Sequence, residues 1–175
     1  TGGIDQPASL DAALEGVTHV IHCAGATKAL NAEGFFTVNQ LGTRNVVEAV
    51  NRRGGQIQRL VLISSLAAAG PGTTEHPRQE SDPPKPVSDY GRSKLAAERE
   101  VITGCKTDWT IIRPPGVYGP RDREFLRLFK AVQAHVLPRF GGGGQPLTLV
   151  YAPDLAAAIV AATTHVNAGR EIFFA

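Results

Sequence analysis

The chain has 175 residues, of which 42% are hydrophobic and 19% charged, and its formal net charge at pH 7 is +2. This length can bury one real core, and the small net charge argues against nucleic acid or an anionic membrane as a partner. No stretch approaches 18 apolar residues, so we expect no membrane span. The two cysteines, Cys23 and Cys105, favour a reducing and therefore cytoplasmic location.

Three apolar runs predict strands of a parallel sheet. They span residues 20–25, 60–65 and 110–115. Runs that are apolar on both faces suit buried parallel strands, and the long amphipathic stretches between them suit crossover helices of an α/β fold. In such sheets ligands bind beyond the carboxyl ends of the strands, where Gly25, Ser65 and Pro114 lie.

Helices are expected between and after these strands. The predicted ranges are 9–16, 31–53, 90–104, 122–134 and 153–165. Ser9 is expected to cap the first helix and Asn31 the second, in which Val38 and Leu41 recur at helical spacing. Pro153 suits the first turn of the last helix. Residues 66–86 are rich in Gly, Pro, Glu and Ser and predict a loop over the strand ends.

Tyr90 and Lys94 are the most informative pair of residues in the chain. Four positions apart on a helix, they share one face. A neighbouring ammonium favours the phenolate, and a shift of roughly three units from pKa ~10 would make the tyrosine an acid/base near neutrality. The same spacing also arises by chance, where the ring merely covers the core and the amine is solvated.

Further motifs accompany this pair in chain order. They are His22-Cys23-Ala24-Gly25, Asn39 within residues 36–43, Ser64–Gly70, Arg113–Pro120 and Val150–Ala156. The ordered set resembles an extended short-chain dehydrogenase/reductase of the NAD-dependent epimerase/dehydratase type, over nearly the whole chain. The resemblance implies a Rossmann-like doubly wound parallel sheet, here partial. It assigns residues 1–120 to a partial NAD(P)-binding domain and 121–175 to a small, partial substrate-binding region, with the chain returning to the core near 147–160.

The same resemblance assigns catalytic roles to four residues. Tyr90 would exchange a proton with the substrate oxygen, and Ser65 would donate a hydrogen bond to that oxygen. Lys94 would lower the tyrosine pKa and bind the nicotinamide ribose. Asn39 either fixes a water or a backbone kink in a proton relay, or is a helix-face asparagine that bonds locally.

The resemblance also predicts binding residues. The cofactor set is Ile4, Ala24, Gly25, Ser64, Tyr90, Lys94, Pro114 and Val117, and the substrate set is Lys28, Ser65, Tyr118 and Arg121. Lys28 can equally be an ordinary exposed lysine, and Pro114 and Val117 a simple turn after a strand. His22 is expected to be a satisfied core histidine and Cys23 a small hydrophobe on a buried strand. The histidines show no metal-ligand spacing, so no metal is expected.

One departure from the family pattern concerns the phosphates of the cofactor. The family begins with a strand, a glycine-rich turn and a helix that holds the pyrophosphate, whereas Thr1–Asp5 resembles a segment after the third strand. The glycines at 141–144 lack the required context and indicate a loop. We therefore expect an internal piece of a longer protein, which alone binds the cofactor weakly and associates through an exposed strand edge.

Two functions remain open from the sequence. The first is an NAD(P)-dependent epimerase, dehydratase or reductase that acts by hydride transfer on a secondary alcohol or ketone, with NAD slightly favoured over NADP. Its partner would be a small molecule, a nucleotide sugar or a steroid-like compound, and a homodimer is possible. The second is a non-catalytic dinucleotide-binding or structural relative of the same fold.

Overall fold

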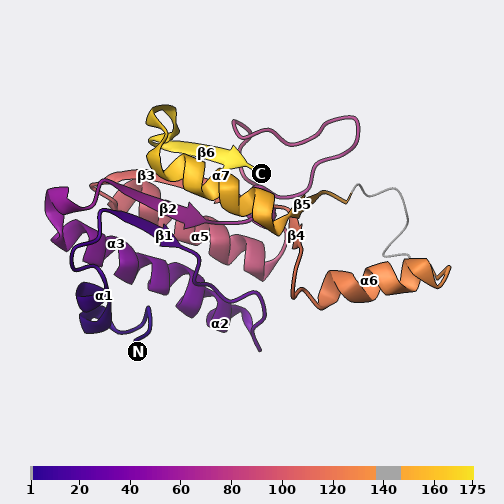
Figure 1. Ribbon diagram of the computed structural model, residues 1–175, viewed down its shortest axis with the longest axis horizontal. Coiled ribbons are helices and arrows are strands. Elements are labelled where there is room, and N and C mark those ends of the chain that lie inside the picture. The colour runs from indigo at the N-terminus through magenta and orange to yellow at the C-terminus, as the bar shows by residue number, and fades with distance from the viewer. Residues whose placement is uncertain (1, 137–146) are drawn as a thin grey trace.

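The computed structural model describes residues 2–136 and 147–175. Its main sheet is parallel, with strand order β1-β2-β3-β6, and β4 and β5 form a separate parallel pair (Figure 1). The strands are β1 (His19–His22), β2 (Arg59–Ile63), β3 (Asp108–Arg113), β4 (Gly116–Tyr118), β5 (Leu149–Tyr151) and β6 (Glu171–Phe174). The predicted α/β fold with a Rossmann-like parallel sheet is confirmed.

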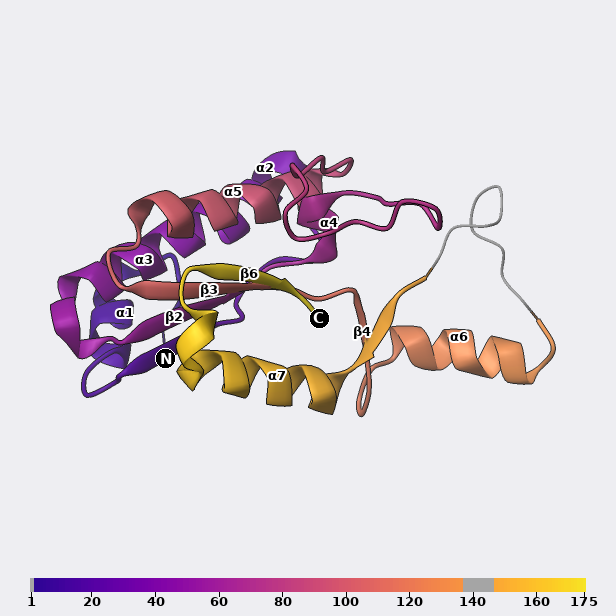
Figure 2. The same cartoon turned by 90° about the horizontal axis from the view of Figure 1, so that it is seen from above.

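Helices cover both faces of this sheet. They are α1 (Pro7–Ala13), α2 (Ala32–Phe36), α3 (Gly42–Arg52), α4 (Leu66–Ala69), α5 (Asp89–Gly104), α6 (Glu124–Gln133) and α7 (Ala152–Thr164), with the short turns η1 (Thr37–Leu41), η2 (Gly54–Gln56) and η3 (Val166–Ala168). Figure 2 shows α3 and α5 on one face and α7 on the other, so the sheet is the middle of three layers. The predicted glycine loop at 141–144 lies outside the described residues.

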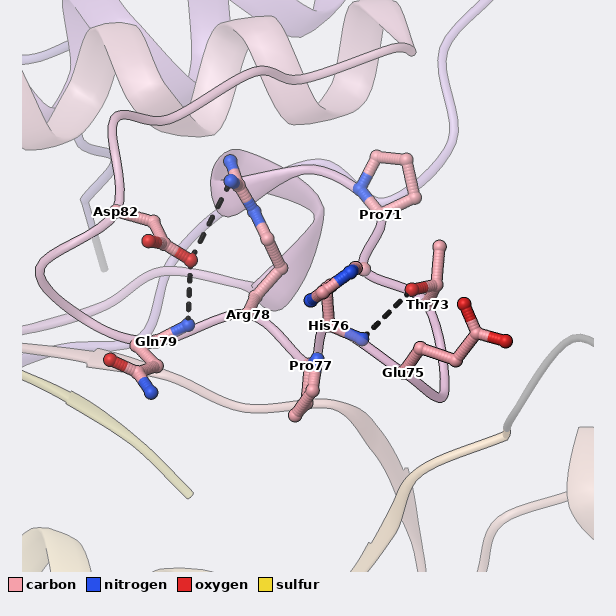
Figure 3. A pocket seen from close by; sticks show the side chains of 9 residues that line it. Pro71, Thr73, Glu75, His76, Pro77, Arg78, Gln79 and Asp82 are labelled. Carbon is pink, nitrogen blue, oxygen red and sulfur yellow. Dashed lines mark hydrogen bonds and ion pairs between the residues drawn. The ribbon is translucent and has the colours of Figure 1, made fainter.

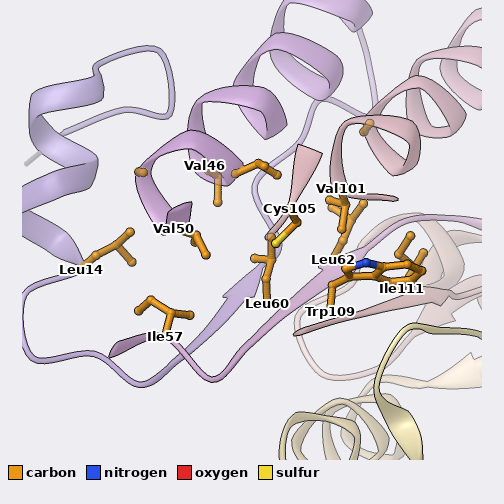
Figure 4. Close-up of a cluster of buried hydrophobic side chains, with 13 residues drawn as sticks. Leu14, Val46, Val50, Ile57, Leu60, Leu62, Val101, Cys105, Trp109 and Ile111 are labelled. Carbon is orange, nitrogen blue, oxygen red and sulfur yellow. The ribbon is translucent and has the colours of Figure 1, made fainter. Parts of the chain in front are cut away.

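Two apolar clusters hold the three layers together. The larger lies between the sheet and the helices α3 and α5, and Figure 4 shows Val46 and Val50 of α3 facing Leu60 of β2. The smaller contains Val61, Ile112 and Leu155 and seats α7 on the opposite face. Successive residues of β2 thus face opposite clusters, which is why a continuous apolar run predicts this strand correctly.

The first strand is less buried than its sequence predicts. Among the described residues β1 pairs only with β2, so it is the edge of the main sheet. Ile21 is 43% exposed, and Cys23, just beyond the strand, is exposed as well. The predictions that this strand and Cys23 are buried are therefore wrong, whereas the exposed strand edge that the sequence analysis expects is present among the described residues.

Two helix limits differ from the predicted ones. The first helix begins at Pro7, whose ring suits a first helical turn, and the Ser9 hydroxyl donates to the carbonyls of Gly3 and Gln6 instead of capping. The predicted loop at 66–86 begins with a turn of helix, α4, which Ser65 caps. The first helix also ends earlier than predicted, at Ala13. The Asn31 cap is as predicted, because its Oδ1 accepts the Gly34 N–H at 2.9 Å.

The long helix predicted from Asn31 to Arg53 is interrupted by a π-helical turn, η1. The wider turn shifts the phase of the helix, so that Asn39 is 1% exposed while Val38 and Leu41 are 36% and 43% exposed. The prediction that Val38 and Leu41 lie on the apolar face is wrong for this reason. A single inserted residue in a π turn frequently marks a functional site.

Two glycines permit the close packing of α4 against α5 and the following loop. A Cβ on Gly91 would collide with the Ala67 carbonyl, and one on Gly70 would collide with the Lys85 carbonyl. Gly70 also has φ +87°, a conformation that side chains disfavour. Both positions therefore require glycine, and they fix the segment that follows β2.

Residues 116–136 and 147–151 lie outside the main sheet, to which the chain then returns. β4 pairs with β5, and α6, between them in sequence, lies beyond the end of the main sheet (Figure 2). α7 and β6 then rejoin the main layers. The division into domains at residue 120 stays a prediction. In the described part of the chain, no helix is long and apolar enough to cross a membrane.

Candidate functional site

The carboxyl ends of β1, β2 and β3 meet at one edge of the main sheet, because these strands are parallel and paired in register. Ser65 follows β2 and Pro114 follows β3. The Leu66 N–H donates to the Pro114 carbonyl at 2.9 Å, which holds the two strand ends side by side. Helix α5 brings Tyr90 and Lys94 to the same edge, so the structure gathers the residues that the motifs predict together.

Tyr90 lies half-buried in the first turn of α5. Its ring meets Phe35 edge-on, with 5.9 Å between the ring centroids. Burial raises the pKa of Tyr90, and the nearby Ser65 side chain offsets part of this rise. Ser65 therefore lies close to the Tyr90 phenol, as expected. The predicted lowering of the Tyr90 pKa by Lys94 is wrong here, because the loss of hydration dominates.

Lys94 is 6% exposed, and its ammonium donates a hydrogen bond to the carbonyl of Ile63, the last residue of β2, at 2.7 Å. Burial lowers the pKa of Lys94 to about 8, and the negative charges of Glu98 and Cys23 act in the opposite direction. The chance alternative of a solvated amine is excluded by this burial. Lys94 is therefore a buried cation at the centre of the candidate site.

Ser65 has a structural task beside its predicted catalytic one. Its Oγ accepts the Ala67 N–H at 3.2 Å and caps α4, while its O–H can still donate to a neighbour. The adjacent Ser64 is buried, and its hydroxyl donates to Glu98. The Ser64 side chain is thereby committed to the protein interior, which leaves Ser65 as the serine that faces Tyr90.

Asn39 holds the loop after β1 in place. Its Oδ1 accepts the Ala26 N–H at 2.7 Å, and its Nδ2 donates to the Ala26 carbonyl at 3.1 Å and to Ser93 Oγ at 2.9 Å. The alternative that Asn39 bonds locally along its helix is wrong, since both partners are distant in sequence. Its part in a proton relay stays a prediction. A Cβ on Gly25 would lie 3.0 Å from Asn39 Oδ1, so the backbone passes close to this amide.

The structure adds two residues that are absent from the predicted site sets, although one of them, Arg113, opens the Arg113–Pro120 motif. Glu98 lies one helical turn after Lys94 and is fully buried. Arg113, the last residue of β3, donates to both carboxylate oxygens of Glu98, at 2.9 and 2.7 Å. The sequence signal was present, because Tyr90, Lys94 and Glu98 recur every four positions along one face.

Not all of the other predicted cofactor residues have side chains at the carboxyl edge of the main sheet. Pro114 is buried beside Leu66, whereas Ala24 and Val117 are exposed. The Ile4 side chain packs against Gly42 of α3, where a Cβ would collide with it, and it joins the main core. The side chain of Ile4 therefore faces the protein interior, and its contact with a cofactor stays a prediction.

The predicted substrate residues other than Ser65 lie along the separate region of β4 and α6. Lys28 forms an ion pair with Glu124, and both side chains are largely exposed. Tyr118 packs between Tyr151 and Phe129, with ring-centroid distances of 5.5 and 5.9 Å. Arg121 is exposed in a left-handed conformation with φ 73°. An exposed pairing of this kind contributes little stability, so Lys28 could readily exchange Glu124 for another anion.

A cavity of about 740 Å³ opens beside Ser65. Its lining is largely apolar and includes Leu66, Val87, Pro114 and Phe174. Pockets of this size and character are typical of small-molecule sites. The cavity therefore offers space for a ligand directly next to the serine.

A second cavity, of about 560 Å³, is formed within the loop at residues 71–82 (Figure 3). Arg78 and Asp82 point toward each other across it, 3.7 Å apart, and Thr73 Oγ1 accepts the His76 N–H. The guanidinium also donates to the carbonyls of Ala69 and Pro83 at 2.6 and 2.7 Å. These bonds hold the loop together.

His22 is buried at the end of β1 and bonded to Thr43 Oγ1 at 3.0 Å, which confirms a satisfied core histidine. Burial, and then the charge of Lys94, lower the pKa of His22 to about 4, so the imidazole is neutral at physiological pH. Over residues 2–136 and 147–175, no three His, Cys, Asp or Glu side chains gather in a group that could hold a metal ion.

Comparison with known proteins places this geometry in a family. The model of the NAD dependent epimerase/dehydratase family matches residues 1–173. The ceramide reductase of Caulobacter vibrioides is 36% identical over 162 residues, which are 92% of this chain and 45% of that protein. The human sterol-4-alpha-carboxylate 3-dehydrogenase (decarboxylating) is 36% identical over 121 residues, 65% of this chain and 32% of that protein.

Solved structures with the same fold are also found. Pal from Bacillus thuringiensis superposes with a TM-score of 0.85 at 26% identity, over 99% of this chain and 60% of that one. MoeE5 in complex with UDP-glucose and NAD superposes with a TM-score of 0.83 at 25% identity, over 99% and 61%. The chain spans about half the length of the curated relatives that match nearly all of it. It belongs to the NAD dependent epimerase/dehydratase family.

Proposed function

We propose that the protein containing this chain is an NAD-dependent oxidoreductase or epimerase that acts on a secondary alcohol or ketone. One observation carries the proposal: Ser65, Tyr90 and the buried Lys94 lie at the carboxyl edge of one parallel sheet, where Ser65 also lines a largely apolar cavity. A buried cation is expensive to maintain, and such groups gather where chemistry needs them. A purely structural role would not require all three.

The residues at this edge fit the nicotinamide half of the cofactor. Gly25 presents bare backbone above Asn39 and Lys94, where a Cβ would lie 3.0 Å from Asn39 Oδ1 and 3.6 Å from Lys94 Nζ. Lys94 uses one donor for the Ile63 carbonyl, and an ammonium has three, so two remain for ribose hydroxyls. Gly25, Lys94 and Pro114 would thus hold the ribose and ring. Complexes of relatives such as MoeE5 contain NAD, which supports NAD over NADP.

The chemistry follows from the side chains. The nicotinamide, when bound, supplies or accepts the hydride. Tyr90 moves the proton: its phenol is protonated at neutral pH and can donate to a carbonyl oxygen. Ser65 donates a hydrogen bond to the same oxygen and so fixes it within reach of Tyr90. Lys94 supplies a positive charge close to the oxygen on which negative charge develops.

The cavity beside Ser65 favours a substrate with an apolar body. Prolines, Leu66, Val87 and Phe174 form much of its wall, and this character supports a steroid-like or lipid-like alcohol or ketone over a sugar. Two relatives are named for ceramide and sterol chemistry, whereas the MoeE5 complex contains UDP-glucose. Nucleotide sugars are therefore the alternative substrate class, to be assayed beside the apolar ketones. A homodimer and a cytoplasmic location remain expectations from the sequence.

A non-catalytic dinucleotide-binding relative is the second candidate. The observation in its favour is that Ser65 and Lys94 already bond within the fold, since Ser65 caps α4 and Lys94 donates to the Ile63 carbonyl.

The test uses the protein as its gene encodes it, with NADH or NADPH and a panel of steroid-like ketones, long-chain ketones and nucleotide sugars. We expect loss of the nicotinamide absorbance of the reduced cofactor with an apolar ketone, and nearly none with the Tyr90→Phe variant. Cofactor binding seen by fluorescence without turnover of any compound would favour the non-catalytic relative. Neither binding nor turnover would refute both functions.

A further inference from the structure

Glu98 is a fully buried carboxylate for which the proposed chemistry has no direct use. It accepts two hydrogen bonds from Arg113, whose side chain is 3% exposed, and a third from the Ser64 hydroxyl. Arg113 in turn lies over the ring of Phe174, 5.9 Å from its centroid. The carboxylate therefore joins helix α5 to the ends of both β2 and β3.

The bonds of Glu98 and Lys94 form a regular pattern. Lys94 donates to the carbonyl of Ile63, and one turn later Glu98 accepts from the next residue, Ser64. Lys94 and Glu98, on consecutive turns of α5, thus bond to the consecutive residues Ile63 and Ser64, and Ser65 follows directly. On the other side, Glu98 holds Arg113, and Pro114 comes directly after it. The two residues that enter the site from the sheet both follow a residue bonded to Glu98.

We propose that Glu98 is a positioning residue of the candidate active site: it locks the ends of β2 and β3 against α5 and balances the buried charge of Lys94. The proposal deepens the proposed function, because it names what holds Ser65, Lys94 and Pro114 in mutual register. Glu98 itself touches neither the cavity nor the reacting atoms, since its oxygens are occupied by Ser64 and Arg113.

Stability alone would not require a charge at this position. A buried ion pair can often be replaced by apolar side chains of similar volume without loss of stability. The charge has a second use here, because Lys94 is also buried and lies one turn away on the same face. The titratable groups that act on the Lys94 pKa are Glu98 of α5 and Cys23 after β1. The charge of Lys94 in turn lowers the pKa of His22, Tyr90 lies one turn before Lys94, and Arg113 pairs with Glu98. Of these, Glu98 opposes the effect of burial on the Lys94 pKa most strongly.

The test measures the charge of Lys94 directly, without cofactor or turnover. Lysine labelled with ¹³C at Cε is incorporated, and the Lys94 signal, assigned with a Lys94→Met variant, is titrated from below to well above neutral pH. In the wild type we expect a midpoint at about pH 8. In Glu98→Gln, which keeps the size of the side chain, the midpoint should fall by roughly one unit, because an opposite charge has been removed.

The matched control is Glu100→Gln, which removes the same charge two residues along the same helix. Glu100 pairs with Arg44 on the outside of α5, so the Lys94 midpoint should stay where it is in the wild type. Should Glu98→Gln fail to fold, the double variant Glu98→Met/Arg113→Met replaces the whole pair with apolar side chains. The Lys94 midpoint should still fall, but by less than in Glu98→Gln, because the positive charge of Arg113 is lost together with the negative charge of Glu98. An unchanged Lys94 midpoint in whichever of these variants folds would overturn the proposal, and Glu98 would then be structural only.

Activity provides a separate measurement. If the proposed function holds, the alkaline limb of kcat/KM against pH should move to lower pH in Glu98→Gln by the same amount as the Lys94 midpoint. If no compound is turned over by the wild type, the proposed function fails, yet the titration still decides the role of Glu98. The two failures are therefore distinguishable.

Discussion

His22 should make the fold sensitive to acid, and the structure allows the size of this effect to be worked out. The pKa of His22 is lowered from 6.5 to about 4 in the folded state, first by burial and then by Lys94. Between these values the unfolded chain binds a proton that the folded chain does not, so stability is lost as the pH falls from 6.5 toward 4. At about 1.36 kcal/mol per unit, the loss approaches roughly 3 kcal/mol.

The measurement is urea unfolding at a pH of about 7.5 and again at about 4.5, on either side of the unfolded-state pKa of histidine. Trp109, the single tryptophan, lies in the main core and reports unfolding by its fluorescence. With a urea dependence of about 2 kcal/mol per molar, the midpoint should fall by on the order of 1 M more in the wild type than in His22→Gln. His19→Gln, three residues earlier on β1, serves as the control and should behave like the wild type.

Equal losses in the wild type and in His22→Gln would show that other groups cause the acid sensitivity. A direct titration of the His22 imidazole by NMR with a midpoint near the ordinary histidine value of about 6.5 would refute the reasoning as well. In that case water would have to reach the His22 imidazole, beside Thr43 and Lys94, from the open side of the edge strand β1.

The remaining predictions concern the site and its packing. Tyr90→Phe should remove nearly all turnover while changing cofactor affinity by no more than about threefold, whereas Lys94→Ala should weaken both; kinetics and fluorescence titration of NADH measure the two effects. Ser65→Ala should lower kcat by roughly 10² or more, because it removes a positioned donor. Ser64→Ala should lower kcat much less than Ser65→Ala does, but should destabilise the fold by about 1–3 kcal/mol in urea unfolding, because it removes the hydroxyl that donates to a buried carboxylate; equal kinetic losses from both serines would contradict this assignment. Gly91→Ala should lower the thermal midpoint, since its Cβ would collide with the Ala67 carbonyl, and an unchanged midpoint would mean that α4 can move away freely.

Local patterns in the sequence were enough to predict most of the fold. The apolar runs at β2 and β3, the Asn31 cap and the Pro153 start are all short-range signals, and each acts within a few residues of the chain. The order of the motifs was sufficient to assign the family. Spacing also singles out Ser65, Tyr90 and Lys94 as candidates, because strand ends and helix faces follow from it, and the structure brings all three to the carboxyl edge of the sheet; their catalytic roles stay predictions.

Other features depend on which elements pack together, and no local pattern encodes that. The exposure of Ile21 and Cys23 follows from β1 lying at the edge of the described sheet. The π turn that buries Asn39 depends on the distant backbone of Ala26, which stabilises the shift in phase with two hydrogen bonds. The pKa of Tyr90 is raised rather than lowered, because burial is a property of the assembled site. Sequence spacing identified which side chains belong to the candidate site, whereas tertiary packing set their burial and their pKa values.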